Sequence, residues 1–201
     1  LPGQAIQNES MDTTHFSIAD KFGNLVGNTY TLNSTYGSGI IIDGTGILMN
    51  NEMDDFVSAP GIPNQFGLLG GEANKIEPYK RPLSSMTPTL VFKNNQPILA
   101  TGSPGGSFII TAVLQFLLNT LNFKMEISDA TVVPRLHHQW KPDVLMLEHG
   151  FDVNHAETIK SLGQPIYFTD PRTSLESIEL KNNFFYGFGD TRRPDSKAKG
   201  L

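Results

Sequence analysis

The sequence contains no cysteine, which excludes disulfide bonds, thiolate metal sites and cysteine nucleophiles. It also lacks an excess of positive charge, since 15 Lys and Arg stand against 20 Asp and Glu and the net charge is −5 at pH 7. Binding to phosphate backbones needs a broad cationic surface, which this balance does not supply. The composition therefore argues against nucleic acid as a partner.

Long hydrophobic runs are missing as well. The longest, "FIITAVLQFLLNTL", is interrupted by Thr111, Gln115 and Asn119 and is shorter than the roughly 20 apolar residues that span a bilayer. The opening "LPGQAIQNES" has neither the basic nor the apolar region of a signal peptide, so we expect any export signal to lie upstream in a longer product. The 201 residues fit one domain or a large part of a bigger one, at roughly 100 to 200 residues per domain.

The order of apolar and turn-forming residues predicts a mixed α and β chain. Residues 1–12 are polar and aperiodic, which is typical of a linker. Alternating segments on either side of "KFGN" predict a hairpin that begins near His15. Residues 50–88 are rich in Asn, Pro and Gly, and a loop of that length indicates a binding function. Further strands are expected at 39–42, 46–49, 89–92, 98–101, 165–168, 174–180 and 184–188, and helices at 108–121, 127–131 and 154–162.

A glycine loop, "GSPGGS", precedes the longest predicted helix. Gly105 and Gly106 would let an anion approach backbone N–H groups at the helix start, for which Ser107 is the expected N-cap. A Walker phosphate loop needs Lys and then Ser or Thr after the last Gly, whereas Ser107 and Phe108 follow here. No nucleotide or other cofactor is therefore predicted. On composition alone, an oxyanion hole and a simple strand-to-helix turn are equal alternatives.

Three other clusters carry polar chemistry. Glu52, Asp54 and Asp55 form an acidic group that suits a cation or ammonium, although composition alone favours a solvated charge run and the EF-hand spacing is absent. Ser84 and Ser85 lie in a proline-bounded turn, where their hydroxyls can bind a carboxylate or their own backbone. Adjacent histidines at 137 and 138 point apart on either a helix or a strand, which favours structural roles and no metal site.

The remaining nucleophile candidates are the threonines in "DTTH", at the start of the predicted hairpin. A threonine hydroxyl needs a base to become nucleophilic. If the peptide bond before Thr13 were cut, its new α-amine, with an ordinary pKa near 8, would act as that base near neutral pH. Cleavage would thus create the catalyst.

The chain closely resembles the small subunit of γ-glutamyltransferase (γ-glutamyltranspeptidase) over roughly residues 9–190. The resemblance is carried, in this order, by "TTHFSIADKFGN", "TYTLNSTYGSGI", "LMNNEMDDF", "PNQFGLLGGEAN", "KRPLSSMTPT", "TGSPGGSFIIT" and "PRLHHQW". It implies an α+β fold: the four-layer αββα sandwich of N-terminal-nucleophile hydrolases, completed by a large subunit. It also implies self-cleavage of a zymogen between Asp12 and Thr13. Residues 1–12 would then end the large subunit or form a linker, and residues 13–201 would be the small catalytic subunit.

The same resemblance implies a role for each matching residue. Thr13 would be the nucleophile, Thr31 would hydrogen-bond it, and the amides of Gly105 and Gly106 would form the oxyanion hole. The α-ammonium of a γ-glutamyl group would bind Asn33, Glu52 and Asp55, and its α-carboxylate would bind Ser84 and Ser85. The implied activity is acyl transfer and hydrolysis of γ-glutamyl amides such as glutathione, with water, an amino acid or a dipeptide as acceptor. No metal or cofactor is implied, and the expected location is periplasmic or extracellular.

Departures from the family pattern and competing functions remain. Phe66 stands where many bacterial members have a tyrosine whose hydroxyl latches a lid to Asn33, and "GDTRRPD" replaces the commoner "DPR". The family also uses an Arg of the large subunit for the α-carboxylate, so we expect the isolated chain to be inactive. One alternative is a related acylase, such as a cephalosporin acylase or a capsule transpeptidase. Another is an unprocessed or isolated fragment that acts only as the partner of the large subunit.

Overall fold

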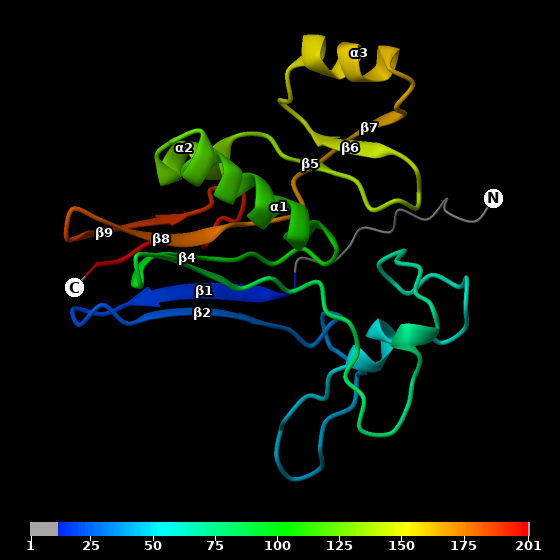
Figure 1. Ribbon diagram of the computed structural model, residues 1–201. Coiled ribbons are helices and arrows are strands. Elements are labelled where there is room, and N and C mark those ends of the chain that lie inside the picture. Colours follow the sequence, from blue (N-terminus) through cyan, green and yellow to red (C-terminus); the bar gives the residue numbers. More distant parts are fainter. Residues whose placement is uncertain (1–11, 201) are drawn as a thin grey trace.

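The computed structural model describes residues 12–200, so the predicted linker at 1–11 lies outside the described residues. Figure 1 shows a layer of helices above one sheet and a second sheet below it. The lower sheet is the predicted hairpin: β1 (Thr14–Ala19) pairs antiparallel with β2 (Leu25–Tyr30). Asp20 closes its turn, because its carboxylate accepts from the backbone N–H groups of Phe22 and Asn24. This closure fixes the register and places Thr13 at the open end of the hairpin.

The upper sheet has the order β3-β4-β8-β9 and is antiparallel throughout. Its strands are β3 (Thr89–Lys93), β4 (Gln96–Thr101), β8 (Glu176–Lys181) and β9 (Phe184–Gly189). Helices α1 (Phe108–Leu117) and α2 (Ile127–Val132) cover it (Figure 1). The core between helix and sheet contains Leu99, Ile109, Val113, Phe116 and Leu175. Each such side chain contributes about 1.5 to 3 kcal/mol when fully buried, which anchors α1 and the glycine turn before it.

A third, small sheet has the order β5-β6-β7. It contains β5 (Leu136–His137), β6 (Leu145–Glu148) and β7 (Ile166–Thr169), and α3 (Val153–Ser161) connects the parallel pair β6 and β7. Asp152 caps α3 by accepting from the N–H groups of Asn154 and His155. The sequence predicted α3 and β7 but missed β5 and β6. Their two and four residues are too short to show an apolar period.

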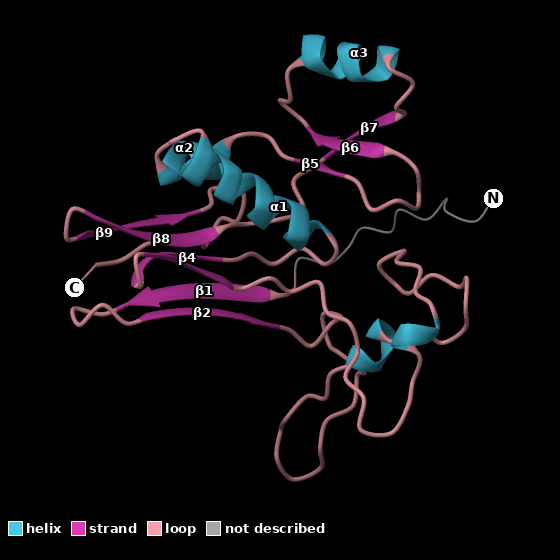
Figure 2. Cartoon of the chain, in the orientation of Figure 1, coloured by secondary structure: helices cyan, strands magenta, loops and turns pink. Residues whose placement is uncertain are grey.

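Residues 50–88 form the predicted long loop, which Figure 2 shows as connecting segments with little regular structure. Two short 3-10 turns lie in it, η1 (Glu52–Asp55) and η2 (Glu72–Asn74). The Nδ2 of Asn74 donates to Asp55 O at 2.7 Å, and its Oδ1 accepts from Leu83 N at 2.9 Å. One side chain therefore ties the acidic turn to the segment that carries the paired serines.

Two predictions about secondary structure were wrong. The expected strands at 39–42 and 46–49 form only an isolated bridge between Ile41 and Leu48, because positive-φ glycines at 39, 44 and 46 interrupt the extended backbone. The predicted all-round burial of the helix at 108–121 also fails. Ile110 and Leu114 are 49% and 53% exposed on one face, and a π-helical turn (Leu118–Asn122) ends the segment. No helix within residues 12–200 is long and apolar enough to cross a membrane.

Candidate active site

Thr13 lies at the open end of the hairpin and is 8% exposed. Its Oγ1 donates to Thr31 Oγ1 at 3.1 Å, and Thr31 Oγ1 also accepts from Asn33 N at 2.9 Å. The Thr13 carbonyl accepts from Arg193 Nη1 at 3.1 Å. The proton of the Thr13 hydroxyl therefore points to Thr31, which leaves the oxygen lone pairs directed elsewhere. A base is still needed to activate this hydroxyl as a nucleophile.

Asn33 joins the segment that follows β2, which carries Thr31, to the acidic turn. Its backbone is left-handed at φ +77°, a conformation that Asn tolerates better than most residues. The Asn33 side chain is buried, and its Nδ2 donates to Asn51 O at 3.3 Å. Asn51 N donates in return to Leu32 O at 3.1 Å. These two bonds place Glu52, the next residue, beside the nucleophile segment.

Glu52 and Asp55 share the η1 turn and form a hydrogen-bonded carboxyl pair. Burial and the neighbouring charge of Asp55 raise the pKa of Glu52 to about 7. Burial also raises the pKa of Asp55, against the lowering effect of its hydrogen bond with Glu52. The Glu52 Oε1 atom is buried with no hydrogen-bond partner among the described residues. A pair of this kind holds either a shared proton or a cation.

The paired serines differ in their surroundings. Ser85 and Asp55 line the same cavity, of about 70 Å³, together with Asn64 and Asn74. Ser84 is exposed and outside that lining, and its Oγ accepts from Met86 N at 3.2 Å. The structure thus brings one of the two predicted carboxylate-binding hydroxyls into the cavity that Asp55 lines, whereas Glu52 is not part of that lining. The other hydroxyl makes the local backbone bond that its sequence also allowed.

Gly105 and Gly106 form the turn between β4 and α1, with φ of +130° and +55°. A Cβ on Gly105 would meet the Arg172 carbonyl oxygen at 2.4 Å, so only glycine fits. The turn lies near the nucleophile strand, since a Cβ on Gly102 would overlap the ring of His15. Gly102, just before this turn, therefore contacts β1, the strand that follows Thr13, and the oxyanion-hole role of Gly105 and Gly106 stays a prediction.

Ser107 lies at the N-cap position of α1, as predicted, but its side chain does not cap the helix. It occupies the N-cap position with helical φ and ψ of −63° and −24°, and its side chain makes no capping bond. Its Oγ donates to Gln139 Oε1 at 2.8 Å instead. Backbone bonds from Phe108 N to Gly105 O and from Ile109 N to Gly106 O extend the helix through the glycine turn.

A cluster of buried ion pairs, which the sequence did not predict, lies next in the chain to Arg193, the residue that contacts the Thr13 carbonyl. Arg135 Nη2 contacts Asp190 Oδ2 at 2.5 Å, and Arg192 contacts both Glu148 at 2.7 Å and Asp190 at 3.1 Å. Burial alone would raise the pKa of Asp190, but the Arg135 guanidinium and several hydrogen bonds hold it below its ordinary value. Because Arg193 follows directly, the cluster fixes the residue that contacts the Thr13 carbonyl. The unusual "TRRPD" string was the only signal, and its register was undefined.

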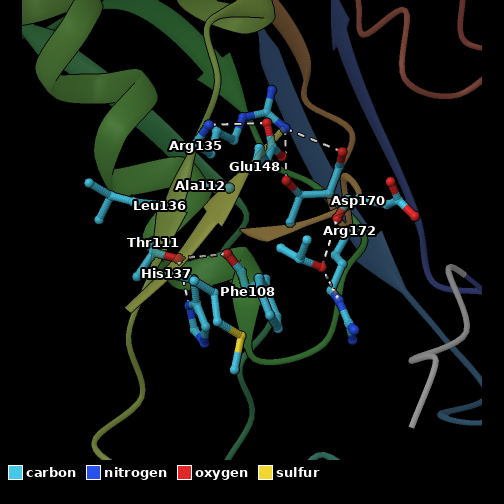
Figure 3. A pocket seen from close by; sticks show the side chains of 12 residues that line it. Phe108, Thr111, Ala112, Arg135, Leu136, His137, Glu148, Asp170 and Arg172 are labelled. Carbon is cyan, nitrogen blue, oxygen red and sulfur yellow. Dashed lines mark hydrogen bonds between the residues drawn. The ribbon is translucent and has the colours of Figure 1, made fainter. Parts of the chain in front are cut away.

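A small cavity beside this cluster is structural rather than a substrate site. Figure 3 shows Arg135 and Glu148 at one end of it and the stacked rings of His137 and Phe108 at the other. Its volume of about 10 Å³ admits at most one water molecule. Burial lowers the pKa of His137, whose ring nitrogens bond Thr111 and Gln139. Within residues 12–200, no group of three or more His, Asp or Glu side chains is placed to hold a metal ion.

The sequence is similar to a known protein family over nearly its whole length. Residues 3–200 match the family model described as gamma-glutamyltranspeptidase. The chain is 46% identical over 200 residues to the glutathione hydrolase proenzyme of Escherichia coli (strain K12) and covers 99% of its own length and 34% of that protein. The chain therefore spans about a third of the length of the curated relatives that it matches.

Solved structures of γ-glutamyltranspeptidases are also similar to this chain. A mutant γ-glutamyltranspeptidase from Helicobacter pylori aligns with a TM-score of 0.85 and 48% identity, over 90% of this chain and all of that one. A γ-glutamyltranspeptidase from Pseudomonas nitroreducens in complex with L-DON aligns with a TM-score of 0.85 and 38% identity, over 94% of this chain and 98% of that one. A cephalosporin acylase from Bacillus halodurans, at 23% identity and a TM-score of 0.74, shares the fold alone, over 88% of this chain and 32% of that one. The family match over nearly the whole sequence, and the fold that accompanies it, show that this chain belongs to the γ-glutamyltranspeptidase family.

Proposed function

We propose that this chain is the catalytic small subunit of an enzyme that transfers or hydrolyses γ-glutamyl groups, with glutathione as a substrate. The observation that carries the proposal is the hydrogen bond from the Thr13 hydroxyl to Thr31, at the open end of a hairpin beside an acidic pair. The proenzyme relative from Escherichia coli, named a glutathione hydrolase, supports the same substrate class.

The catalyst arises by self-cleavage in this account. Thr13 Oγ attacks the carbonyl carbon of Asp12, the Asp12–Thr13 C–N bond breaks, and an ester to the threonine oxygen forms. Breakage of the C–N bond frees the Thr13 α-amine, and water then hydrolyses the ester, which restores the Thr13 hydroxyl and leaves Asp12 with a carboxylate. Residues 13–201 become the small subunit. The Arg193 bond to the Thr13 carbonyl and the Thr31 bond to its hydroxyl hold the residue for both reactions.

Turnover then uses both groups of one residue. The Thr13 amine accepts the hydroxyl proton while Thr13 Oγ attacks the γ-carbonyl carbon, and the amides of Gly105 and Gly106 bind the oxyanion. The γ-amide C–N bond breaks, and the leaving amine takes the proton. A γ-glutamyl ester on Thr13 remains. Water releases glutamate from it, whereas the amino group of an amino acid or dipeptide produces a new γ-glutamyl compound.

The α-ammonium of the substrate would supply the positive charge and the hydrogen-bond donor that Glu52 and Asp55 lack. An α-ammonium placed against Glu52 and Asp55 would donate to the unpartnered Glu52 Oε1 and replace the shared proton. The Ser85 hydroxyl, which lines the cavity with Asp55, is placed for the α-carboxylate, and we assign Ser84 to the same group. Asn33 orients the acidic turn from the nucleophile side.

A large subunit from the same precursor is the proposed partner. The chain spans about a third of its curated relatives, and it exposes apolar side chains that a partner would cover. They are Ile110 and Leu114 on α1 and Phe184, Phe185 and Tyr186 on β9. Residence in the periplasm or outside the cell is part of the same proposal and is tested by cell fractionation.

The decisive experiment compares two anilides with the full processed enzyme. A γ-glutamyl anilide carries the α-amine, and a glutaryl anilide lacks it. We expect kcat/KM for the γ-glutamyl anilide to exceed that for the glutaryl anilide by at least about 100-fold. Without the α-amine, the carboxyl groups of Glu52 and Asp55 have no positively charged partner in the substrate. Equal turnover would reject the γ-glutamyl assignment and favour the acylase alternative, which the shared fold of the cephalosporin acylase keeps open.

The alternative of an inactive partner fragment is tested on the same sample. The intact mass of each polypeptide shows whether the chain has been cut before Thr13. A sample in which every molecule remains uncut and turns over neither anilide would favour that alternative.

A further inference from the structure

The amide of Gln139 joins two parts of the proposed active site, the turn at residues 64–68 and the oxyanion turn before α1. Its Oε1 accepts from Ser107 Oγ at 2.8 Å and pairs with His137 Nε2 at 2.9 Å. Its Nε2 donates to Phe66 O at 3.3 Å and to Lys141 O at 3.2 Å. An amide can make four hydrogen bonds, and all four are used here. Gln139 thus has one orientation, fixed by partners on three separate segments.

One partner belongs to a rigid turn at residues 64–68. The Asn64 Oδ1 accepts from the N–H groups of Phe66 and Leu68, both at 3.0 Å. Gln65 links this turn to the acidic side of the site: its N donates to Asp54 Oδ2 at 3.0 Å, and its Oε1 accepts from Ser34 Oγ at 3.1 Å. Asp54 and Ser34 directly adjoin Asp55 and Asn33 in the sequence. The 64–68 turn is therefore hydrogen-bonded to the direct neighbours of two proposed ammonium-binding residues.

The other partner, Ser107, is 3% exposed and directly follows Gly106. Its hydroxyl is committed to Gln139 rather than to capping α1. The segment that carries Gln139 is itself held in an unusual shape, because Trp140 has a left-handed φ of +70°. Such a conformation is rare for a bulky residue, and it persists only where the surroundings enforce it.

We infer that Gln139 is a positioning residue that couples the loop which binds the substrate head group to the oxyanion turn. Its nitrogen holds the 64–68 turn, and its oxygen holds Ser107. Substrate bound against Glu52 and Asp55 fixes the 64–68 turn, and Gln139 transmits that order to the amides of Gly105 and Gly106. The inference rests on the proposed function, since it names how that site is assembled.

The test uses the full-length precursor after processing, with three variants and one control. Gln139→Met keeps the size and removes all four bonds, whereas Ser107→Ala removes only the bond to the oxyanion turn. We expect Gln139→Met to lower kcat about tenfold and to raise KM several-fold, roughly one hydrogen bond for each effect. We expect Ser107→Ala to lower kcat by a similar factor with KM within twofold. The double variant should have the kcat of Gln139→Met alone, because both changes break one shared bond.

Gln115→Met is the matched control. Gln115 Nε2 donates to Thr111 O and Leu136 O, and its Oε1 accepts from Leu136 N, so it also fastens α1 to β5 but contacts neither the 64–68 turn nor Ser107. This control should lower the unfolding temperature while kcat and KM of the folded enzyme stay within twofold. Equal kinetic effects of Gln115→Met and Gln139→Met, or multiplicative losses of kcat in the double variant, would overturn the inference.

The wild-type reaction separates the inference from the proposed function. If the wild type prefers the glutaryl anilide, the γ-glutamyl assignment is rejected. The coupling is then tested by measuring kcat of the same variants with the glutaryl anilide as substrate. If the wild type hydrolyses the γ-glutamyl anilide and Gln139→Met leaves both constants unchanged, only the coupling is rejected. A correctly processed wild type that hydrolyses neither anilide rejects both.

Discussion

Replacing Glu52 by Gln should remove most of the pH dependence of substrate binding in the acidic range. Burial and the charge of Asp55 raise the pKa of Glu52 to about 7, so the pair retains a shared proton below that pH. An α-ammonium competes with this proton for the same oxygens. Wild-type KM should therefore rise about tenfold for each pH unit below 7, reaching about 100-fold at pH 5, if only the deprotonated pair binds. The amide introduced by Glu52→Gln does not titrate, so KM of that variant should stay nearly constant from pH 5 to 8.

The two curves should cross. The variant loses the negative charge and binds the ammonium about tenfold more weakly than the wild type at pH 8, as expected for one charged hydrogen bond. At pH 5 it should bind at least as well as the wild type. The assay is KM for a γ-glutamyl anilide at several pH values, with Glu72→Gln as a control, because Glu72 lies in the same loop but is exposed and pairs with Lys75. An unchanged acidic limb in Glu52→Gln would refute the reasoning.

The same raised pKa has a consequence for folding. A carboxyl whose pKa is higher in the folded protein binds more protons there between its ordinary value of 4.5 and about 7. Stability of the substrate-free enzyme should therefore fall as pH rises through that window, and a bound ammonium should remove part of the fall. The unfolding temperature with and without glutamate, measured from pH 4.5 to 7.5, checks the sign.

Three further predictions concern the nucleophile, the oxyanion turn and the ionic cluster. Thr31→Val should slow both processing and turnover by at least about tenfold, because the Thr13 hydroxyl loses its hydrogen-bond acceptor. Thr31→Ser keeps a hydroxyl and should retain most of both rates, measured by intact mass and by anilide release. Equal rates for the two variants would count against the assignment. Gly105→Ala places a Cβ 2.4 Å from the Arg172 carbonyl and should lower kcat about 100-fold, whereas Gly39→Ala, with open space around its Cβ, should not. Asp190→Asn should cost about 3 kcal/mol at pH 7 by calorimetry. Because the pKa of Asp190 lies below its ordinary 3.8, the difference should shrink as pH falls below that value.

The sequence predicted those parts of the fold whose signal is local. The β1–β2 hairpin, α1, α2, α3 and the strands β3, β4 and β7 to β9 follow from alternation, apolar period and turn residues. The failures have physical causes in each case. Residues 39–49 have strand-forming isoleucines, yet positive-φ glycines allow only one bridge. The exposed apolar face of α1 looks like core in sequence, because exposed and buried apolar residues give the same local pattern.

The site residues divide in the same way, into those with a signal in the sequence and those defined only by contacts between distant residues. Thr13, Thr31, the acidic pair and the glycine turn were all named from the sequence through the family resemblance, and the structure places Thr31 against Thr13. Gln139 and Arg193 were not found, because their contacts span 32 and 180 residues of sequence. A polar side chain that acts through such distant partners leaves no periodic or spacing signal. Only the fold brings these partners together.

The central claim is that the hydroxyl of Thr13 carries the acyl group after the bond before it has been cut. The most direct measurement is peptide mass spectrometry of the full-length, processed enzyme, quenched in acid during turnover of a γ-glutamyl substrate. The account predicts a γ-glutamyl adduct on a peptide whose first residue is Thr13, with the modification on that residue. An adduct on any other side chain, or on a peptide still joined to Asp12, would contradict it.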